Sequence, residues 1–190
     1  PQGRPRELVD ALLRKAEWAG ADGVVLDLEE HWKNKRAEAR ALMDLSMQEV
    51  HGRNMVLGVS SLGSVYTRSN ASLPIEEFSI ADFGLPQLYD PGYIFNPDGS
   101  LKGNCSSFHC ENYVQEGVQA WKNRGFYRVV PVLATRPTSG AIKTTEQVSA
   151  LLRIATPVID TAVSWWAWGS TAYILPAHWD IIRDFQLPNP

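Results

Sequence analysis

The stretch Asp22-Gly23-Val24-Val25-Leu26-Asp27-Leu28-Glu29-Glu30 combines a short apolar run with carboxylates at its end. The apolar, largely β-branched residues 24–26 predict a strand of a parallel sheet that is covered on both faces. Because side chains alternate along a strand, we expect Asp27 and Glu29 to point to the same side, with Cα atoms roughly 6.6 Å apart. Active sites of α/β barrels lie at the carboxyl ends of the strands, so this pair predicts a catalytic site.

Two carboxylates at this spacing suit acid catalysis. A neighbouring like charge raises the pKa of one carboxyl group, which then holds a proton at neutral pH. Placing Asp27 and Glu29 together in a sheet costs free energy, and this favours a functional role. The alternative is a strand end whose acids cap a helix or face the solvent.

The composition is that of an ordinary globular protein of 190 residues, with 44% hydrophobic and 21% charged residues. The net charge of −3, without a basic stripe, argues against nucleic acid or an anionic membrane as the partner. No apolar run approaches the ~18 residues of a membrane span. The four histidines lack metal-ligand spacing, so we expect no metal and no cofactor. Seven tryptophans would suit a platform for sugars, although several must belong to the core.

The two cysteines, Cys105 and Cys110, lie in one polar loop. A disulfide between them would indicate an oxidising compartment. Two free thiols fit the sequence equally well.

Hydrophobic periodicity alternates along the chain between helical and strand-like segments. It predicts helices at 5–20, 35–51, 112–125, 144–154 and 176–185, with a short one near 74–78. It predicts buried strands at 23–29, 55–60, 81–89, 127–134 and 163–169. Such alternation predicts right-handed βαβ units and a parallel sheet.

Five strands are too few for a closed eight-stranded barrel. The fold class is therefore α/β, either an open five-stranded sheet or a partial (β/α)8 TIM barrel of about five βα units. The carboxylates at the strand end favour the partial barrel. The two long irregular stretches, 61–79 and 91–109, flank the third strand, and loops of this length are usually functional.

Three segments, in chain order, resemble family 18 glycoside hydrolases, the chitinases and endo-N-acetylglucosaminidases. Residues 22–29 are similar to the family's fourth-strand signature Asp-Gly-φ-Asp-φ-Asp-x-Glu, where φ is apolar. Leu88-Tyr89-Asp90 resembles the sixth-strand Met-x-Tyr-Asp, and Trp166 or Trp168 stands where an eighth-strand Trp lies under the sugar. The resemblance implies that residues 1–190 form a single domain corresponding to strands four to eight, without the first three.

One position departs from that signature. Val25 stands where the family has its first interior Asp, which tunes the second. A second resemblance therefore stays open, to family 25 lysozyme-like muramidases. These also carry an Asp-x-Glu on a barrel strand and aromatic residues on the last strand, and they do not need the extra Asp.

The family 18 resemblance assigns roles to the carboxylates. Glu29 would protonate the leaving glycosidic oxygen as the general acid. Asp27 would hold the N-acetyl group of the substrate, whose oxygen acts as the nucleophile. In a muramidase, Asp27 would instead stabilise the oxocarbenium ion or activate water.

The later strand ends would bind the sugar. The resemblance implies that Tyr89 donates a hydrogen bond to the N-acetyl carbonyl and that Asp90 accepts one from a sugar hydroxyl. Trp168, and to a lesser extent Trp166, would stack on the sugar face, and Gln87 lies on the same side as Tyr89.

Structural roles remain open for the same residues. Asp90-Pro91-Gly92 is an ordinary turn sequence, and the run Trp165-Trp166-Ala167-Trp168 would also suit a core. On a strand, Trp166 and Trp168 share one side, so we expect Trp165 to face the helices.

The sequence therefore predicts a glycosidase that cleaves a β-linked, N-acetylhexosamine-containing glycan of chitin or peptidoglycan type. Such an enzyme would act outside the cell or at a cell wall. The alternatives are a non-catalytic carbohydrate-binding barrel, which Val25 favours, and a structural barrel domain of a larger cell-wall or phage-associated protein.

Overall fold

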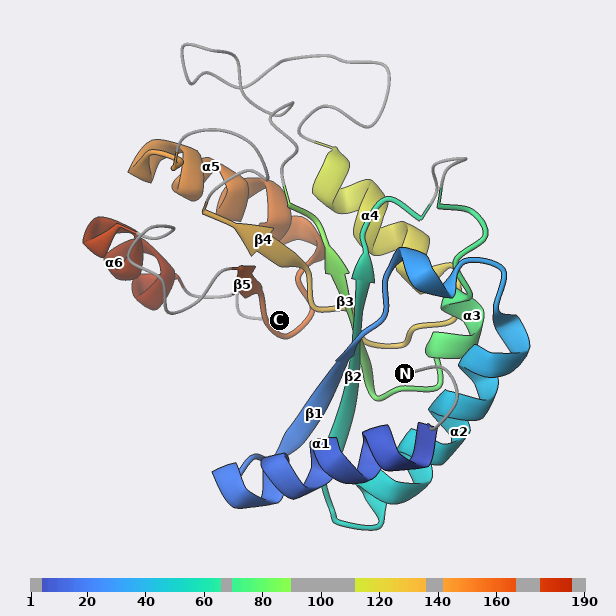
Figure 1. Cartoon of the computed structure of the whole chain (residues 1–190). Helices are drawn as coiled ribbons and strands as arrows, with labels where there is room; N and C mark the ends of the chain where they lie inside the picture. Colours follow the sequence, from blue (N-terminus) through green and yellow to red (C-terminus); the bar gives the residue numbers. More distant parts are fainter. Residues whose placement is uncertain (1–4, 66–69, 90–111, 136–141, 167–174, 186–190) are drawn as a thin grey trace. The chain divides into compact units, whose positions relative to one another are not determined.

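The protein contains a five-stranded parallel sheet whose strands follow one another in chain order, β1-β2-β3-β4-β5 (Figure 1). The computed structural model describes residues 5–65, 70–89, 112–135, 142–166 and 175–185. The strands are Gly23–Asp27, Val56–Leu62, Phe83–Gln87, Val132–Ala134 and Ser164–Trp166. Parallel strands in sequential order, linked by helices, are the arrangement of a (β/α) barrel. The predicted fold class, a partial (β/α)8 TIM barrel of five βα units, is confirmed.

The helices also lie where the periodicity predicts them. They are α1 (Pro5–Ala19), α2 (Arg36–His51), α3 (Ile75–Phe78), α4 (Tyr113–Lys122), α5 (Thr145–Ala155) and α6 (Pro176–Asp184). Two short 3₁₀ helices, η1 (Glu30–Trp32) and η2 (Thr156–Val158), follow β1 and α5. Gly20 ends α1 with a φ of +64°, as expected of a glycine after a helix.

The chain divides into two compact units. The N-terminal unit comprises residues 1–85 and 120–129, and the C-terminal unit comprises residues 86–119 and 130–190. The single domain expected from the sequence stays a prediction.

In the N-terminal unit, the helices α1 and α2 cover one face of β1 and β2 (Figure 1). Val24 and Leu26 of β1 are buried on this face, as are Leu57 and Val59 of β2. They pack in a core with buried helical residues, among them Leu13, Leu42 and Met43. This burial of every second residue is the pattern of a strand with one covered face.

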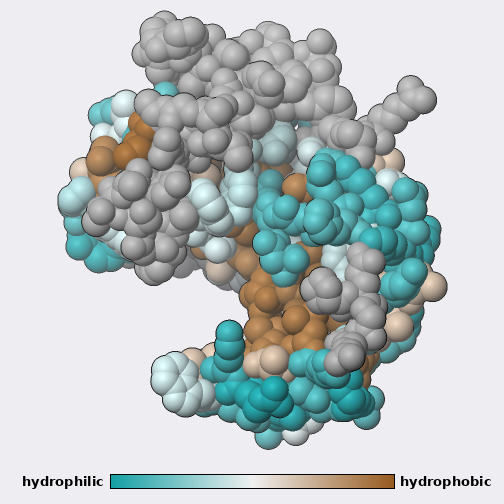
Figure 2. All heavy atoms as spheres, viewed as in Figure 1, coloured by the Kyte–Doolittle hydropathy of each residue, from teal (hydrophilic) through white to brown (hydrophobic). Residues whose placement is uncertain are grey.

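The expectation that β1 is covered on both faces is wrong. Val25 is 46% exposed, and Val56 at the start of β2 is 48% exposed. Figure 2 shows the resulting hydrophobic area over these strands. The physical reason is that α1 and α2 cover only the other face of these strands, where Val24, Leu26, Leu57 and Val59 are buried.

The fourth strand is shorter than the predicted 127–134. Pro131 has no amide hydrogen to donate, and the regular ladder begins only at Val132. Before it, Val129 pairs with Gly84 in an isolated parallel bridge. The first strand likewise ends at Asp27, because the chain turns into η1 three residues later.

In the C-terminal unit, β4 pairs with β5, and Leu133 and Trp165 are buried on the same side of this pair. Helix α5 begins with a capping box, in which the amide of Gln147 donates to Thr144 Oγ1 (3.3 Å) and the Gln147 side chain accepts from the amide of Thr144 (2.9 Å). The N-cap of α5 is therefore Thr144.

Candidate active site

Asp27 and Glu29 lie at the carboxyl end of β1, on the side that the helices leave open. Asp27 is the last residue of the strand, and its side chain is exposed between the buried Leu26 and Leu28. Glu29 is exposed too and directly precedes η1, but its side chain makes no capping hydrogen bond to that helix. The structure thus does not support the alternative in which Glu29 caps a helix.

The register of the sheet places Ser60 beside Asp27. The two residues are Cα partners in the β1–β2 ladder, and the amide of Leu28 donates to the carbonyl oxygen of Ser60 (2.8 Å). Paired residues of parallel strands present their side chains on the same face, about 4.8 Å apart. The next residue, Ser61, is buried and donates its hydroxyl to the carbonyl oxygen of Leu28. The two adjacent serines therefore lie on opposite faces.

The layer below Asp27 and Ser60 is apolar. It contains Val25 and its partner Gly58. A Cβ atom added to Gly58 would come within 2.6 Å of the Phe83 ring, so this ring lies directly over the glycine. Asp27 and Ser60 thus stand on a hydrophobic floor.

The C-terminal unit carries the aromatic part of the predicted site. Gln87 ends β3 and pairs with Val132, and Tyr89 follows two residues later. The Tyr89 ring lies 5.5 Å from the Trp166 ring, at an interplanar angle of 42°. Trp166 ends β5 and is 44% exposed, whereas Trp165 is buried at 8%, as expected of neighbours that point to opposite faces. The shared side of Trp166 and Trp168 stays a prediction.

Two predicted site residues, Asp90 and Trp168, lie outside the described residues, as do Cys105 and Cys110. Of the others, the structure brings Tyr89 and Trp166 into contact within the C-terminal unit. Asp27 and Glu29 lie together in the N-terminal unit. The sequence analysis missed Ser60, because its place beside Asp27 depends on the register between β1 and β2.

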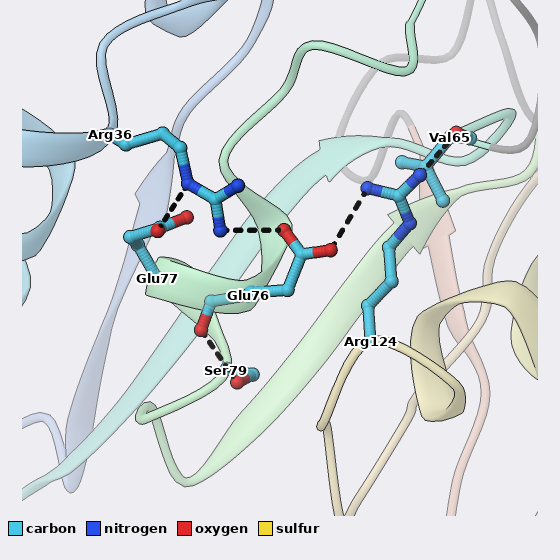
Figure 3. A network of polar contacts seen from close by, with 6 residues as sticks. All are labelled: Arg36, Val65, Glu76, Glu77, Ser79 and Arg124. Carbon is cyan, nitrogen blue, oxygen red and sulfur yellow. Dashed lines mark hydrogen bonds and ion pairs between the residues drawn. The ribbon is translucent and has the colours of Figure 1, made fainter.

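An ion-pair network lies beside the loop that follows β2 (Figure 3). Arg36 at the start of α2 contacts Glu77 (2.6 Å) and Glu76 (3.6 Å) of α3. Arg124 contacts Glu76 (3.5 Å) and donates to the carbonyl oxygen of Val65 (3.1 Å). The hydrogen bond and charge of Glu77 raise the pKa of Arg36. This network joins α2, α3 and the loop after β2 in the N-terminal unit.

Within the described part of the chain, no cluster of His, Cys, Asp and Glu side chains is suited to hold a metal ion. In the same residues, no helix is long and apolar enough to cross a membrane.

Comparison with known proteins gives similarity in structure but not in sequence. No protein-family model and no curated protein sequence matches the chain. A class V chitinase from Pseudomonas fluorescens matches with a TM-score of 0.65 and 15% identity, over 94% of this chain and 71% of that one. A chitinase from Chromobacterium violaceum matches with a TM-score of 0.63 and 13% identity, over 92% of this chain and 69% of that one.

The chain has the fold of a chitinase barrel. A mutant of catalytic domain 2 of the Group II chitinase from Ostrinia furnacalis, solved in complex with a chito-oligosaccharide, also matches, with a TM-score of 0.50 and 15% identity. It is matched over 72% of this chain and 42% of its own length, so this chain spans less than half of it. The resemblance to a chitinase-like barrel is confirmed for the fold, and the resemblance to a muramidase stays a prediction.

Proposed function

We propose that this chitinase-like barrel belongs to a glycoside hydrolase that cleaves β-linked glycans containing N-acetylhexosamine. The observation that carries the proposal is the position of Asp27 and Glu29. Both are exposed at the carboxyl end of β1, while Leu26 before Asp27 and Leu28 between the two acids are buried. The carboxyl ends of barrel strands are where enzymes of this fold keep their catalytic groups.

Glu29 is the general acid of the proposed reaction. Its carboxyl group donates a proton to the glycosidic oxygen as the bond from that oxygen to the anomeric carbon breaks. The carbonyl oxygen of the substrate's own N-acetyl group forms a bond to the anomeric carbon, giving a cyclic oxazolinium ion. Water then attacks the same carbon and gives its proton to the Glu29 carboxylate, which restores the enzyme. This is the substrate-assisted variant of glycoside hydrolysis.

Asp27 and Tyr89 stabilise the charge that develops in this step. The Asp27 carboxylate accepts a hydrogen bond from the N–H of the acetamido group and stabilises the positive charge that this group acquires. The Tyr89 hydroxyl donates a hydrogen bond to the acetamido oxygen. Trp166 and Trp168 provide the hydrophobic surface under the sugar ring. Asp90 accepts a hydrogen bond from a sugar hydroxyl, and the Gln87 amide forms a hydrogen bond with another. The contact between Tyr89 and Trp166 supports a shared role for these two residues.

The test is hydrolysis of chito-oligosaccharides and of peptidoglycan fragments, with Glu29→Gln as the decisive variant. We expect kcat to fall at least 100-fold in Glu29→Gln, which is the usual contribution of a general acid. The preferred substrate separates a chitinase-like from a muramidase-like enzyme.

Glu30→Gln is the matched control. Glu30 is the adjacent carboxylate, and it forms a surface ion pair with Lys33 (3.3 Å) that contributes little. The two variants lose the same charge one residue apart, so we expect Glu30→Gln to retain wild-type turnover. Equal turnover by all three proteins would contradict the role of Glu29.

Val25 favours a second candidate, a barrel that binds the glycan without cleaving it. In this case the protein binds chito-oligosaccharides with no turnover, and Glu29→Gln binds as tightly as the wild type. Trp166→Ala then weakens binding, whereas Trp18→Ala, at a 91% exposed position on α1, does not. Binding that survives in Trp166→Ala would contradict this candidate.

A further inference from the structure

The outer face of α1 carries an aromatic side chain that takes no part in the core. Trp18, in the last turn of the helix, is 91% exposed, whereas Leu13 and Ala16 are buried. At about 3.6 residues per turn, Trp18 lies nearly opposite these two residues and points away from α2 and β1, which α1 contacts. A buried tryptophan covers roughly 150–250 Å², so the exposure of Trp18 leaves a large apolar surface open to a ligand.

Three further residues of the same helix complete a hollow beside Trp18. Ala11, Arg14 and Lys15 precede it by seven, four and three positions, a spacing that places the four side chains together on one helical face. The hollow is open to solvent and has a volume of about 340 Å³, at the lower end of the range of small-ligand sites, roughly 300–1,000 Å³. It extends about 10 Å along the helix, at ~1.5 Å per residue.

The two cations of this hollow lack a counter-charge. Arg14 and Lys15 are both exposed, and among the described residues neither forms an ion pair or a side-chain hydrogen bond. The acid beside Trp18, Glu17, pairs with Arg53 instead (3.0 Å). Two unpaired positive charges thus lie next to a flat aromatic ring, and this favours a ligand that carries negative charge.

An acidic glycan matches these groups better than an acidic peptide does. A sugar ring presents C–H bonds on its faces and polar groups at its rim. One face can therefore pack on the Trp18 ring while a carboxylate at the rim accepts charge-assisted hydrogen bonds from Arg14 and Lys15. A bound peptide would also need partners for its backbone amides, which a sheet edge supplies. Helix α1 cannot supply them, because its backbone groups are paired within the helix.

The hollow lies away from the candidate active site. Helix α1 leads into the start of β1 at Gly23, whereas Asp27 and Glu29 lie at the other end of that strand (Figure 1). At ~3.3 Å per residue, the length of β1 alone separates the two places by about 13 Å. A ligand at Trp18 therefore does not occupy the candidate active site.

We propose that Ala11, Arg14, Lys15 and Trp18 form a second glycan-binding site, selective for glycans that carry carboxyl groups. Trp18 packs on a sugar face, and Arg14 and Lys15 bind carboxylates. The inference rests on the proposed function for its role, which is to hold a polymeric substrate on the enzyme away from the bond that is cleaved. Of the glycans considered above, peptidoglycan carries carboxyl groups and chitin does not, so the site selects the peptidoglycan type.

The test is a pair of NMR titrations that follow the indole N–H signal of Trp18, assigned by its loss in Trp18→Phe. The protein is the full chain with Glu29→Gln, which should keep the sugars intact. One ligand is a tetrasaccharide of alternating N-acetylglucosamine and N-acetylmuramic acid, and the other is chitotetraose, which has the same backbone without carboxyl groups. We expect a saturable shift of the Trp18 signal with the acidic tetrasaccharide and none with chitotetraose.

A matched pair of variants tests the charge. Arg14→Gln removes one of the two cations and should raise the Kd of the acidic tetrasaccharide about tenfold, as expected for the loss of a hydrogen bond to a charged group. Arg40→Gln is the control, because Arg40 is an exposed arginine of α2 that pairs with Asp44 (2.9 Å). It removes the same charge from the same unit and should leave the Kd unchanged. The amide spectra show that each variant is folded.

Four results would overturn the inference. They are a Trp18 signal that does not move with the acidic tetrasaccharide, an equal response to chitotetraose, an equal response to a hexaglutamate peptide, and equal Kd values for Arg14→Gln and Arg40→Gln. Hydrolysis assays decide the proposed function separately. Loss of turnover in Glu29→Gln with an unmoved Trp18 signal supports the enzyme and removes the second site. A Trp18 signal that moves as expected supports the second site, even if the protein hydrolyses no glycan.

Discussion

Asp82, just before β3, links three segments of the N-terminal unit through one carboxylate. It accepts hydrogen bonds from the Leu57 amide of β2 (2.7 Å) and from His51 Nε2 at the end of α2 (3.0 Å). Burial raises the pKa of Asp82, but the hydrogen bonds from His51 and Leu57 lower it by more, so the pKa lies below its ordinary value of 3.8. Ionised Asp82 therefore stabilises the folded state.

We predict that Asp82→Asn lowers the free energy of unfolding at pH 7 by about 1 kcal/mol, since the contacts are partly exposed. Because the pKa is lower in the folded state, this stabilisation is complete above the unfolded value of 3.8 and is lost as the pH falls below it. Urea unfolding at pH 7 and at pH 3 measures it. Asp44→Asn, which removes a surface ion pair with Arg40, is the control. An equal effect of Asp82→Asn at both pH values would contradict the account.

His178 holds α6 in the C-terminal unit as a neutral side chain. Its Nδ1 accepts from the Leu175 amide (3.1 Å), and its Nε2 therefore donates to the carbonyl oxygen of Lys143 (2.9 Å). Burial lowers the pKa of His178 and outweighs the opposing effect of the Lys143 carbonyl. The ring must lose its bond to Leu175 if it takes a second proton.

From this we predict a loss of stability in mild acid. The unfolded state binds the proton with a pKa of 6.5 and the folded state with a lower one, so stability is full above 6.5 and falls as the pH decreases below it. The thermal midpoint of the wild type should drop between pH 7.5 and 5.5 more than that of His178→Gln. Parallel curves for the two proteins would show that His178 is not the group responsible.

Among the helices and strands, the sequence predicted which residues of a strand point to opposite faces. It did not predict which of these faces other elements cover. In the described residues, the periodicity located the α-helices and the strands but not the 3₁₀ helices η1 and η2, because it depends on each segment alone. The exposure of Val25 depends on which face of β1 the helices cover, and the sequence of the strand alone does not show this. Ser60 depends on the register between β1 and β2, and no local pattern contains this information.

Gly84 of β3 lies where the end of helix α4 packs on this strand. A Cβ atom at this position would come within 2.6 Å of the Trp121 ring and 2.8 Å of the Phe126 ring, which themselves lie 4.9 Å apart. The absence of a side chain thus allows the end of α4 to pack closely on β3 within the N-terminal unit.

We predict that Gly84→Ala lowers the free energy of unfolding by about 2 kcal/mol through overpacking. In a Trp121→Leu background, the same change should cost clearly less, because the ring it meets is gone. A double-mutant cycle by urea unfolding measures the coupling. Additive effects of the two substitutions would mean that Gly84 is needed for a reason other than this contact.

For the whole molecule, the sequence predicted the fold class and the strands that carry the candidate site. The Asp-x-Glu that starts at the last residue of β1, and the tryptophans of β5, could be read from the sequence because each belongs to one short segment. The division into two units was not foreseen, because it depends on contacts between segments far apart in the chain. The central proposal is that the exposed carboxylates at the end of β1, Asp27 and Glu29, act on a glycan.

The most direct measurement is an NMR titration of the Glu29→Gln variant with chitopentaose, which this variant should bind without cleaving. The signals to follow are the backbone amides of Asp27 and Ser60 at the end of β1 and β2, with the amide of Asp44 on the surface of α2 as the reference. The amides of Asp27 and Ser60 should shift along one saturation curve, while the Asp44 amide stays in place. Amides of Asp27 and Ser60 that do not move at saturating chitopentaose would contradict the proposed site.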